Sequence, residues 1–298
     1  MSPMLAYAPR RGPLGAARPW IAAVYLGPLA IIAFTFANPL VLLAAGAAAA
    51  GAGIAAGAGR SIAQPLRWSV GLAVMVVAVN AIASQRGDTV LFRGSELPVV
   101  GRIDVTLEAL AEGGVLALRI LVSLLVFAVW SACVDPDRVL RAVRPFAARS
   151  ALTATLVSRL VPTAAADGAR MAEAGRLRGP AAAPVGRAAL ARRLVAGSLD
   201  RSVDIAATLE LRGYGLGIRS RLPRHRREPG EGGLLAAGVA GFLAIALAAA
   251  SGVASFDAYP RVAIDLGPGT WLFAFAVPAI ALAPLLPDVL RERRLRRG

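Results

Sequence analysis

Few residues of the chain carry groups that could do chemistry, and arginine dominates among those that do. There is one cysteine, Cys133, and one histidine, His225. The sequence therefore offers no cluster of the thiol, imidazole and carboxylate groups that hold a transition metal. The acidic residues of the central segment are scattered among arginines: Asp167, Glu173, Asp200, Asp204 and Glu210. We expect neither a catalytic centre nor a bound metal or cofactor.

Two arginines stand in matching contexts, each followed by a glycine. The chain reads Arg-Leu-Arg-Gly up to Gly179 and Glu-Leu-Arg-Gly up to Gly213. Glycine directly after a helix is a common left-handed stop, so one helix is predicted to end at Arg178 and another at Arg212. A guanidinium is a planar, two-pronged donor for a carboxylate. Two such arginines favour contacts with a partner protein, whereas a single one would be explained by its interaction with the helix dipole.

A helical wheel places both arginines on apolar faces. At about 100° per residue, Arg212 lies with four apolar side chains and away from a charged sector of its helix. The apolar side chains are Leu190, Leu194, Ile205 and Leu209, and the charged sector holds Arg192, Arg193, Asp200, Asp204 and Glu210. Arg178 lies with Leu156, Leu160 and Met171. Apolar surroundings of this kind would supply a desolvated groove for a guanidinium.

The helices that carry these arginines belong to a long polar segment, residues 135–230. It holds 18 arginines against eight acidic residues and is too polar to cross a bilayer. Three helices are predicted in it, at residues 137–148, 150–178 with a kink at Pro162, and 187–212. The predicted domains are therefore a membrane part over 1–134, cytoplasmic coupling helices over 135–230, and a second membrane part over 231–298.

The rest of the chain is rich in long apolar runs. Hydrophobic residues make up 57% of the sequence, and apolar runs of about 20 residues indicate bilayer spans. Asn38-Pro39 predicts a tight turn. Gly53-Ile-Ala-Ala-Gly57 suits close backbone approach, although compositional bias explains it equally well. Six spans are predicted, at residues 20–36, 40–58, 68–84, 115–133, 234–251 and 271–286. The predicted fold class is all-α: a polytopic membrane protein with about six transmembrane helices and a cytoplasmic coupling-helix insertion.

The arginines also predict the orientation of the spans. The net charge is +15. Residues 85–114 and 252–270 hold more acidic residues than arginines, whereas the first 19 residues, the Arg60–Arg67 turn, residues 135–230 and the C-terminal tail carry excess arginine. The positive-inside rule then places both termini and residues 135–230 in the cytoplasm. Because the charge lies between and after apolar runs, we expect a bacterial inner-membrane protein and no nucleic-acid binding.

Two stretches around the matching arginines resemble a known family. Glu173-Ala-Gly-Arg-Leu-Arg-Gly179 and Asp200-Arg-Ser-Val-Asp-Ile-Ala-Ala-Thr-Leu-Glu-Leu-Arg-Gly-Tyr214 look like the two signature segments of the transmembrane (T) components of energy-coupling-factor (ECF) transporters, the family of the cobalt-transport Q protein. The family's segments end in Ala-Arg-Gly or Ala-Arg-Ser, so this chain departs from the pattern at Leu177 and Leu211. The resemblance extends to Arg159-Leu-Val-Pro162, the Asp135–Arg149 stretch and Asn38-Pro39-Leu40.

The resemblance implies a non-catalytic subunit of an ATP-driven importer. Two ABC-type ATPase subunits would each bind one coupling helix, with Arg178 in one groove and Arg212 in the other. A separate membrane protein, the S component, would bind the substrate, which is a vitamin or a transition metal in this family. The resemblance also implies an ATPase-coupling role for Gly179, Gly213, Glu173, Arg201 and Glu210. Membrane lipid would surround the spans.

Two other functions are weighed against this one. A conventional ABC permease subunit also places a cytoplasmic helix in an ATPase groove, but it usually has one coupling loop rather than two helices that end in Arg-Gly. A membrane-embedded lipid-phosphate transferase usually needs clustered carboxylates for metal or base roles, and the scattered acidic residues do not provide them.

Overall fold

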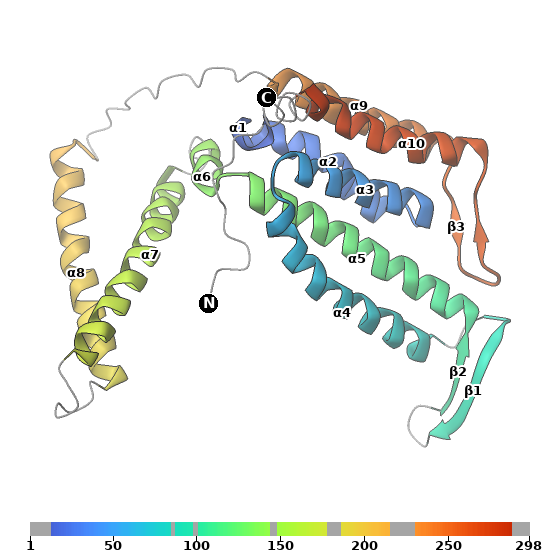
Figure 1. The fold of residues 1–298 in the computed structure, drawn as a ribbon, viewed down its shortest axis with the longest axis horizontal. Helices are drawn as coiled ribbons and strands as arrows, with labels where there is room; N and C mark the ends of the chain where they lie inside the picture. The colour runs from blue at the N-terminus through green and yellow to red at the C-terminus, as the bar shows by residue number, and fades with distance from the viewer. Residues whose placement is uncertain are drawn as a thin grey trace, which may run out of the picture. The chain divides into compact units, whose positions relative to one another are not determined.

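The computed structural model describes residues 13–84, 87–97, 101–143, 148–177, 186–214 and 230–287 (Figure 1). The described chain is mostly helical. It divides into two compact units: Met1–Val139 together with Arg227–Gly298 form the first, and Leu140–Arg226 form the second. The first unit begins with the short helix α1 (Pro13–Ala16) and includes the start of α6 (Pro136–Val143).

Four helices of the first unit are long and apolar enough to cross a membrane, by length and composition. They are α4 (Gly59–Ala83), α5 (Leu107–Cys133), α9 (Glu231–Ala250) and α10 (Pro268–Leu282) with the 3₁₀ turn (Ala283–Leu285) that continues it. Helices α2 (Pro19–Thr35) and α3 (Pro39–Ala55) are apolar but have 17 residues each, about 25 Å at 1.5 Å per residue. The predicted helical fold is thus confirmed, and four of the six predicted spans are long and apolar enough to cross a membrane.

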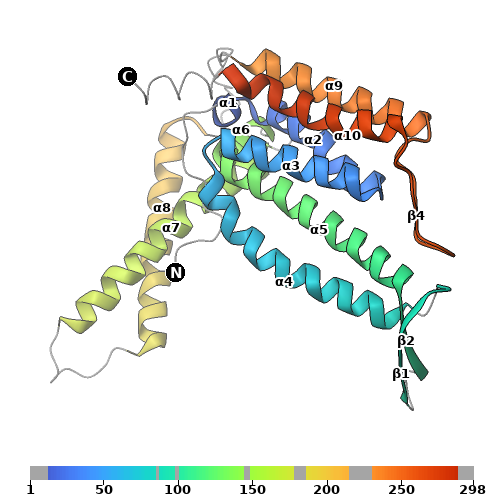
Figure 2. The same cartoon turned by 45° about the vertical axis from the view of Figure 1, so that its right-hand side comes forward.

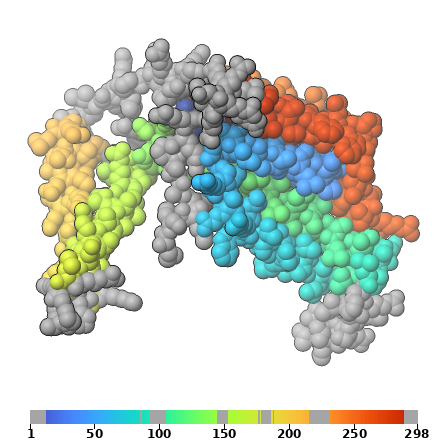
Figure 3. Space-filling view, viewed as in Figure 1, coloured from blue at the N-terminus to red at the C-terminus, as the bar shows by residue number. Residues whose placement is uncertain are grey.

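The two shorter apolar helices lie in the middle of the unit. Figures 1 and 2 show α2 and α3 between α9 and α10 on one side and α5 on the other, with α4 as the outermost helix beside α5. One face of α3 is fully buried, at Val41, Leu42, Ala45, Ala48, Ala49 and Ala52. At the rim of the unit (Figure 3), α4 exposes large apolar side chains, among them Trp68, Val74 and Met75. Exposed apolar surface of this extent is typical of a face that lipid or another membrane protein covers.

A buried asparagine holds the turn between α2 and α3. The side chain of Asn38 accepts a hydrogen bond from the N–H of Leu40 at 3.0 Å, and it donates to the carbonyls of Asp265 at 2.8 Å and Ser255 at 3.3 Å. The carboxylate of Asp265 accepts from the hydroxyl of Thr270 at 2.6 Å, and this bond lowers the pKa of the Asp265 carboxyl. The predicted tight turn is confirmed, and it is tied to the segment that precedes α10.

An ion pair joins the N-terminal ends of α2 and α9. Arg18 directly precedes α2, and Glu231 is the first residue of α9. The Nη2 atom of Arg18 lies 2.8 Å from Oε2 of Glu231, Nε lies 3.1 Å from the same oxygen, and the backbone N–H of Arg18 donates to Oε1 at 3.0 Å. Glu231 is buried. A carboxylate at this position also interacts favourably with the dipoles of both helices.

Two antiparallel hairpins occur in segments that the sequence analysis predicts as loops. Strand β1 (Val90–Leu97) pairs with β2 (Gly101–Thr106), and β3 (Phe256–Asp257) pairs with β4 (Ala263–Ile264). The pairing of β1 with β2 is irregular, with register shifts, and β3 and β4 have two residues each. Strands this short or irregular lack the alternating apolar pattern by which strands are predicted from sequence. The predicted all-α fold class therefore has to be extended by two small hairpins.

Two helices begin earlier than predicted. Helix α4 starts at Gly59, so the predicted Arg60–Arg67 turn is helical, and α5 starts at Leu107. The side chain of Thr106 caps α5 by accepting a hydrogen bond from the N–H of Ala109 at 3.2 Å. Hydropathy marks where a helix becomes apolar rather than where its hydrogen bonding begins, and this accounts for both differences.

The two glycines of the predicted close-approach motif have different roles. A Cβ atom at Gly53 would lie 2.8 Å from Cγ2 of Val129 and 2.9 Å from Cδ1 of Ile62, so neighbouring side chains press against α3 there. Gly57 has a φ of 72° and closes the end of α3, where the N–H of Ala58 donates to the carbonyl of Gly53 at 2.8 Å. Close approach therefore holds at Gly53, whereas Gly57 is a helix stop.

A glycine in α9 tests how closely the membrane helices must pack. A Cβ atom at Gly238 would lie 2.5 Å from the carbonyl oxygen of Val24 in α2, whereas one at Gly232 would meet nothing within 4 Å. Because backbone cannot swing aside, Gly238→Ala should destabilise the protein by about 1–3 kcal/mol, and Gly232→Ala should have little effect. Thermal unfolding in detergent, followed by circular dichroism, compares the two variants. Equal midpoints would contradict the contact between α2 and α9.

Candidate partner-binding helix pair

The second unit is built around two long polar helices, α7 (Ala148–Arg176) and α8 (Arg187–Leu211). They pack against each other, and Figures 1 and 2 show them crossing with opposite chain directions. Near the crossing, a Cβ atom at Gly168 would be 3.5 Å from Cδ1 of Leu194. Opposite chain directions put the C-terminal end of each helix at a different end of the pair. Helix α7 continues through Pro162, where the sequence predicts a kink.

The apolar positions predicted by the helical wheel are less exposed than the charged ones on the same helix. On α8 the half-buried side chains are Leu190, Leu194, Ile205 and Leu209, and on α7 they include Leu156, Leu160 and Met171. The predicted charged sector of α8 is exposed, at Arg192, Arg193, Asp200, Asp204 and Glu210. The division of α8 into a half-buried apolar side and an exposed charged sector is thus confirmed, whereas Arg212, which the wheel places on the apolar side, is exposed.

Arg201 lies on the joined face and ties the two helices together. Its Nη1 atom is 3.0 Å from Oδ2 of Asp167 on α7, and the other oxygen of Asp167 pairs with Arg170. The Arg170 guanidinium, together with that of Arg201, lowers the pKa of the Asp167 carboxyl. Arg201 therefore has a partner within the chain, and the role beside an ATPase that the resemblance implies for it stays a prediction.

The end of α8 has the geometry that the Leu-Arg-Gly sequence predicts. Gly213 adopts a φ of 78°, its N–H donates to the carbonyl of Glu210 at 2.8 Å, and the N–H of Tyr214 donates to the carbonyl of Leu209 at 2.9 Å. This pair of bonds is the Schellman motif, which closes a helix and satisfies its last carbonyls. Arg212 is exposed on the capped turn, so its guanidinium is presented from a fixed backbone.

The matching end of α7 is described as far as Leu177. The N–H of Leu177 donates to the carbonyl of Glu173 at 3.0 Å, and Glu173 is exposed. Arg178 and Gly179 lie outside the described residues. The leucines that depart from the family pattern are the most exposed apolar side chains of the pair, Leu177 at 82% and Leu211 at 88%. Neither is crowded, so a leucine fits where the family carries alanine.

A second apolar row on α8 escaped the sequence analysis. Val195, Leu199 and Val203 are 59%, 62% and 68% exposed, and their spacing of four residues places them along one side of the helix. Because charged residues flank these three side chains, the helical wheel does not separate them as an apolar face of their own. Its apolar surface is uncovered in the described part of the chain, and it enlarges the area of α8 that a partner can cover.

Among the described residues, no group of three or more histidine, cysteine, aspartate and glutamate side chains is placed to hold a metal ion. Cys133 is buried in α5, and His225 lies outside the described residues.

Two glycines of the helix pair provide a matched test of the crossing. Gly168 faces Leu194, whereas a Cβ atom at Gly197 on α8 would meet nothing within 4 Å. Gly168→Leu should force the helices apart, at a cost of about 1–3 kcal/mol. Gly197→Leu should leave the crossing unchanged. Limited proteolysis of the purified variants should show faster cleavage within residues 148–214 only for the Gly168 change. Identical digestion patterns would contradict the packing described above.

Comparison with known proteins leaves the family of the chain open. No known family model matches the sequence, and no curated protein is significantly similar to it.

Proposed function

We propose that the chain is the transmembrane T subunit of an ECF-type ABC importer, a non-catalytic subunit that links two ATPases to a substrate-binding S component. The observation that carries the proposal is the α7–α8 pair, whose C-terminal ends lie at opposite ends of the pair and lead into Leu-Arg-Gly. At the described end, Arg212 is exposed on a turn closed by Gly213. Such a pair offers one docking end to each of two partners.

In this proposal each helix end enters the groove of one ATPase. Arg212 would pair with a carboxylate there, with Glu210 and the exposed Leu211 beside it, and Arg178 would do the same at the other end. Desolvation in the groove strengthens a two-pronged guanidinium contact. The Asp167–Arg201 ion pair at the crossing would keep the helices at a fixed angle, so that closure of the ATPases on ATP moves the pair as one body.

The proposal extends to the membrane unit. All six apolar helices would cross the bacterial inner membrane, with α2 and α3 as short central spans and with both termini and residues 135–230 in the cytoplasm. The arginine distribution supports this orientation. Arg138, in the first unit, donates from Nη1 to the carbonyl of Ala16 at 2.8 Å, which anchors the start of α6 beside α1. The S component would bind the vitamin or transition metal within the membrane.

Accessibility of introduced cysteines tests the orientation. Single cysteines at positions 88 and 257, in the two hairpin-bearing segments, should react with a membrane-impermeant maleimide added to intact cells, because these segments would face outward. A cysteine at position 200 on α8 should react only after the cells are opened. The native Cys133 is buried and gives a low background. Labelling of position 200 in intact cells would overturn the arrangement.

Substitution of the terminal arginines tests the coupling role. Arg212→Ala and Arg178→Ala should each weaken binding to the ATPases by about 2–5 kcal/mol, since each would leave a partner carboxylate buried and unpaired. Arg→Lys should restore little, because an ammonium cannot make the planar contact. The measurements are ATPase co-purification and substrate uptake.

Arg192 serves as the matched control on the same helix. It is exposed in the charged sector of α8, where a surface charge contributes about 0–1 kcal/mol. Arg192→Ala should therefore retain the ATPases and uptake. If the changes at Arg192 and Arg212 had equal effects, bulk positive charge rather than a specific end contact would explain binding, and the proposal would lose its main support.

A further inference from the structure

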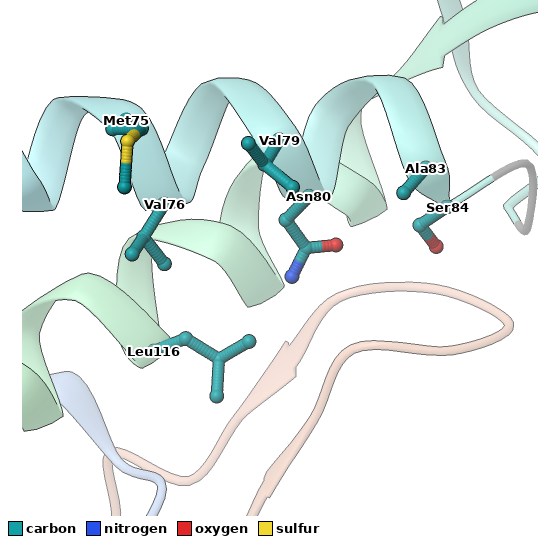
Figure 4. Close-up of a pocket in the computed structure, with 7 residues that line it drawn as sticks. All are labelled: Met75, Val76, Val79, Asn80, Ala83, Ser84 and Leu116. Atoms are coloured by element: carbon teal, nitrogen blue, oxygen red, sulfur yellow. The ribbon is translucent and has the colours of Figure 1, made fainter.

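A cavity opens between α4 and α5. Its volume is about 530 Å³, and its lining is mostly apolar, with Met75, Val76 and Val79 of α4 and Leu116 of α5. Figure 4 shows these side chains together with Asn80 and Ser84 around the opening, and the hairpin runs alongside. The cavity belongs to the rim helix α4, whose exposed side chains are apolar, so it opens where membrane lipid would lie.

A second, polar cavity of about 310 Å³ adjoins the first. The two share Leu116 as a lining residue. The second cavity is also lined by Glu112 and Arg119 of α5 and by Asp257 and Tyr259 of the hairpin. The Tyr259 hydroxyl forms a hydrogen bond of 2.6 Å with the Ser84 hydroxyl, which lines the first cavity. The two cavities therefore form one groove with an apolar part and a charged part.

The charged part of the groove holds one cation and two anions. Arg119 donates from Nε to the carbonyl of Phe36 at 3.2 Å, which fixes its guanidinium while leaving the terminal nitrogens available. Within the described residues, no ion pair involves Glu112, Arg119 or Asp257. Glu112 and Arg119 are two helical turns apart on one side of α5, about 10 Å along its axis. This separation allows Arg119 to bind an anionic group and Glu112 to bind a cationic group of the same ligand.

We propose that this groove binds a phospholipid with a phosphoethanolamine headgroup. Arg119 receives the phosphate, Glu112 and Asp257 receive the ammonium, and an acyl chain passes Leu116 into the apolar cavity. The combined volume falls within the range of about 300–1,000 Å³ that is usual for ligand sites. An ammonium with N–H donors suits two carboxylates, whereas phosphocholine has no N–H and phosphoglycerol has no cation. The inference needs only a membrane location, so it stands apart from the proposed coupling role.

Lipid retention by the purified chain tests the site. The chain is reconstituted in nanodiscs with equal amounts of phosphatidylethanolamine, phosphatidylcholine and phosphatidylglycerol, released into mild detergent and weighed by native mass spectrometry. The expected result is preferential retention of phosphatidylethanolamine. A Glu112→Gln, Asp257→Asn double variant removes both carboxylates and should reduce that preference by at least about tenfold, the effect of losing one charged hydrogen bond. Asp88→Asn, an exposed carboxylate outside the groove, should retain it.

The acyl-chain part of the groove has its own test. Leu116→Trp would fill the passage between the two cavities, and it should reduce retention of all three lipids without changing the melting temperature, since Leu116 is partly exposed. This variant remains informative if the double variant proves unstable. Equal retention of phosphatidylcholine and phosphatidylethanolamine by the native chain, or unchanged retention in Leu116→Trp, would overturn the proposal.

Discussion

The membrane unit depends on how closely its helices approach one another. Between apolar helices in lipid the hydrophobic effect supplies little drive, so packing and hydrogen bonds must hold the bundle. Small residues make this packing possible: Gly238 brings α9 onto the backbone of α2 at Val24, and the alanines of α3 bury one complete face. The short α2 and α3 can therefore sit at the centre, enclosed by helices that reach membrane length.

An ion pair and hydrogen bonds at the ends of the helices fix how these helices are aligned with one another. At one end Arg18 and Glu231 join the starts of α2 and α9. At the other end Asn38 joins the α2–α3 turn to the carbonyl of Asp265. Neither the ion pair nor the Asn38 hydrogen bond lies in the apolar middle of the bundle, where an unsatisfied polar group would cost free energy. The helices are thus free to pack through apolar contacts, while their register is set by hydrogen bonds at their ends.

The sequence predicts the helical elements well because hydropathy, glycine stops and the wheel are local signals. They locate the six apolar helices, the turn at Asn38, the left-handed Gly213 and the half-buried side of α8. They fail where structure depends on distant residues. The ion pair of Arg201 with Asp167 on the neighbouring helix could not be predicted from the sequence. The groove at Arg119 depends on a hairpin that no local sequence pattern predicts. The early starts of α4 and α5 escaped because polar first turns resemble loops.

The crossing of α7 and α8 gives the pair a mechanical property. Contact is concentrated near Gly168, Leu194 and the Asp167–Arg201 ion pair, so each helix is an arm held at a pivot. From Arg201 to Arg212 the arm is about 16 Å long at 1.5 Å per residue. Turning it by about 10° would carry Arg212 through about 3 Å, by the geometry of a rigid arm of that length. A small angular change at one partly exposed ion pair thus becomes a displacement as large as the length of a hydrogen bond at the helix end.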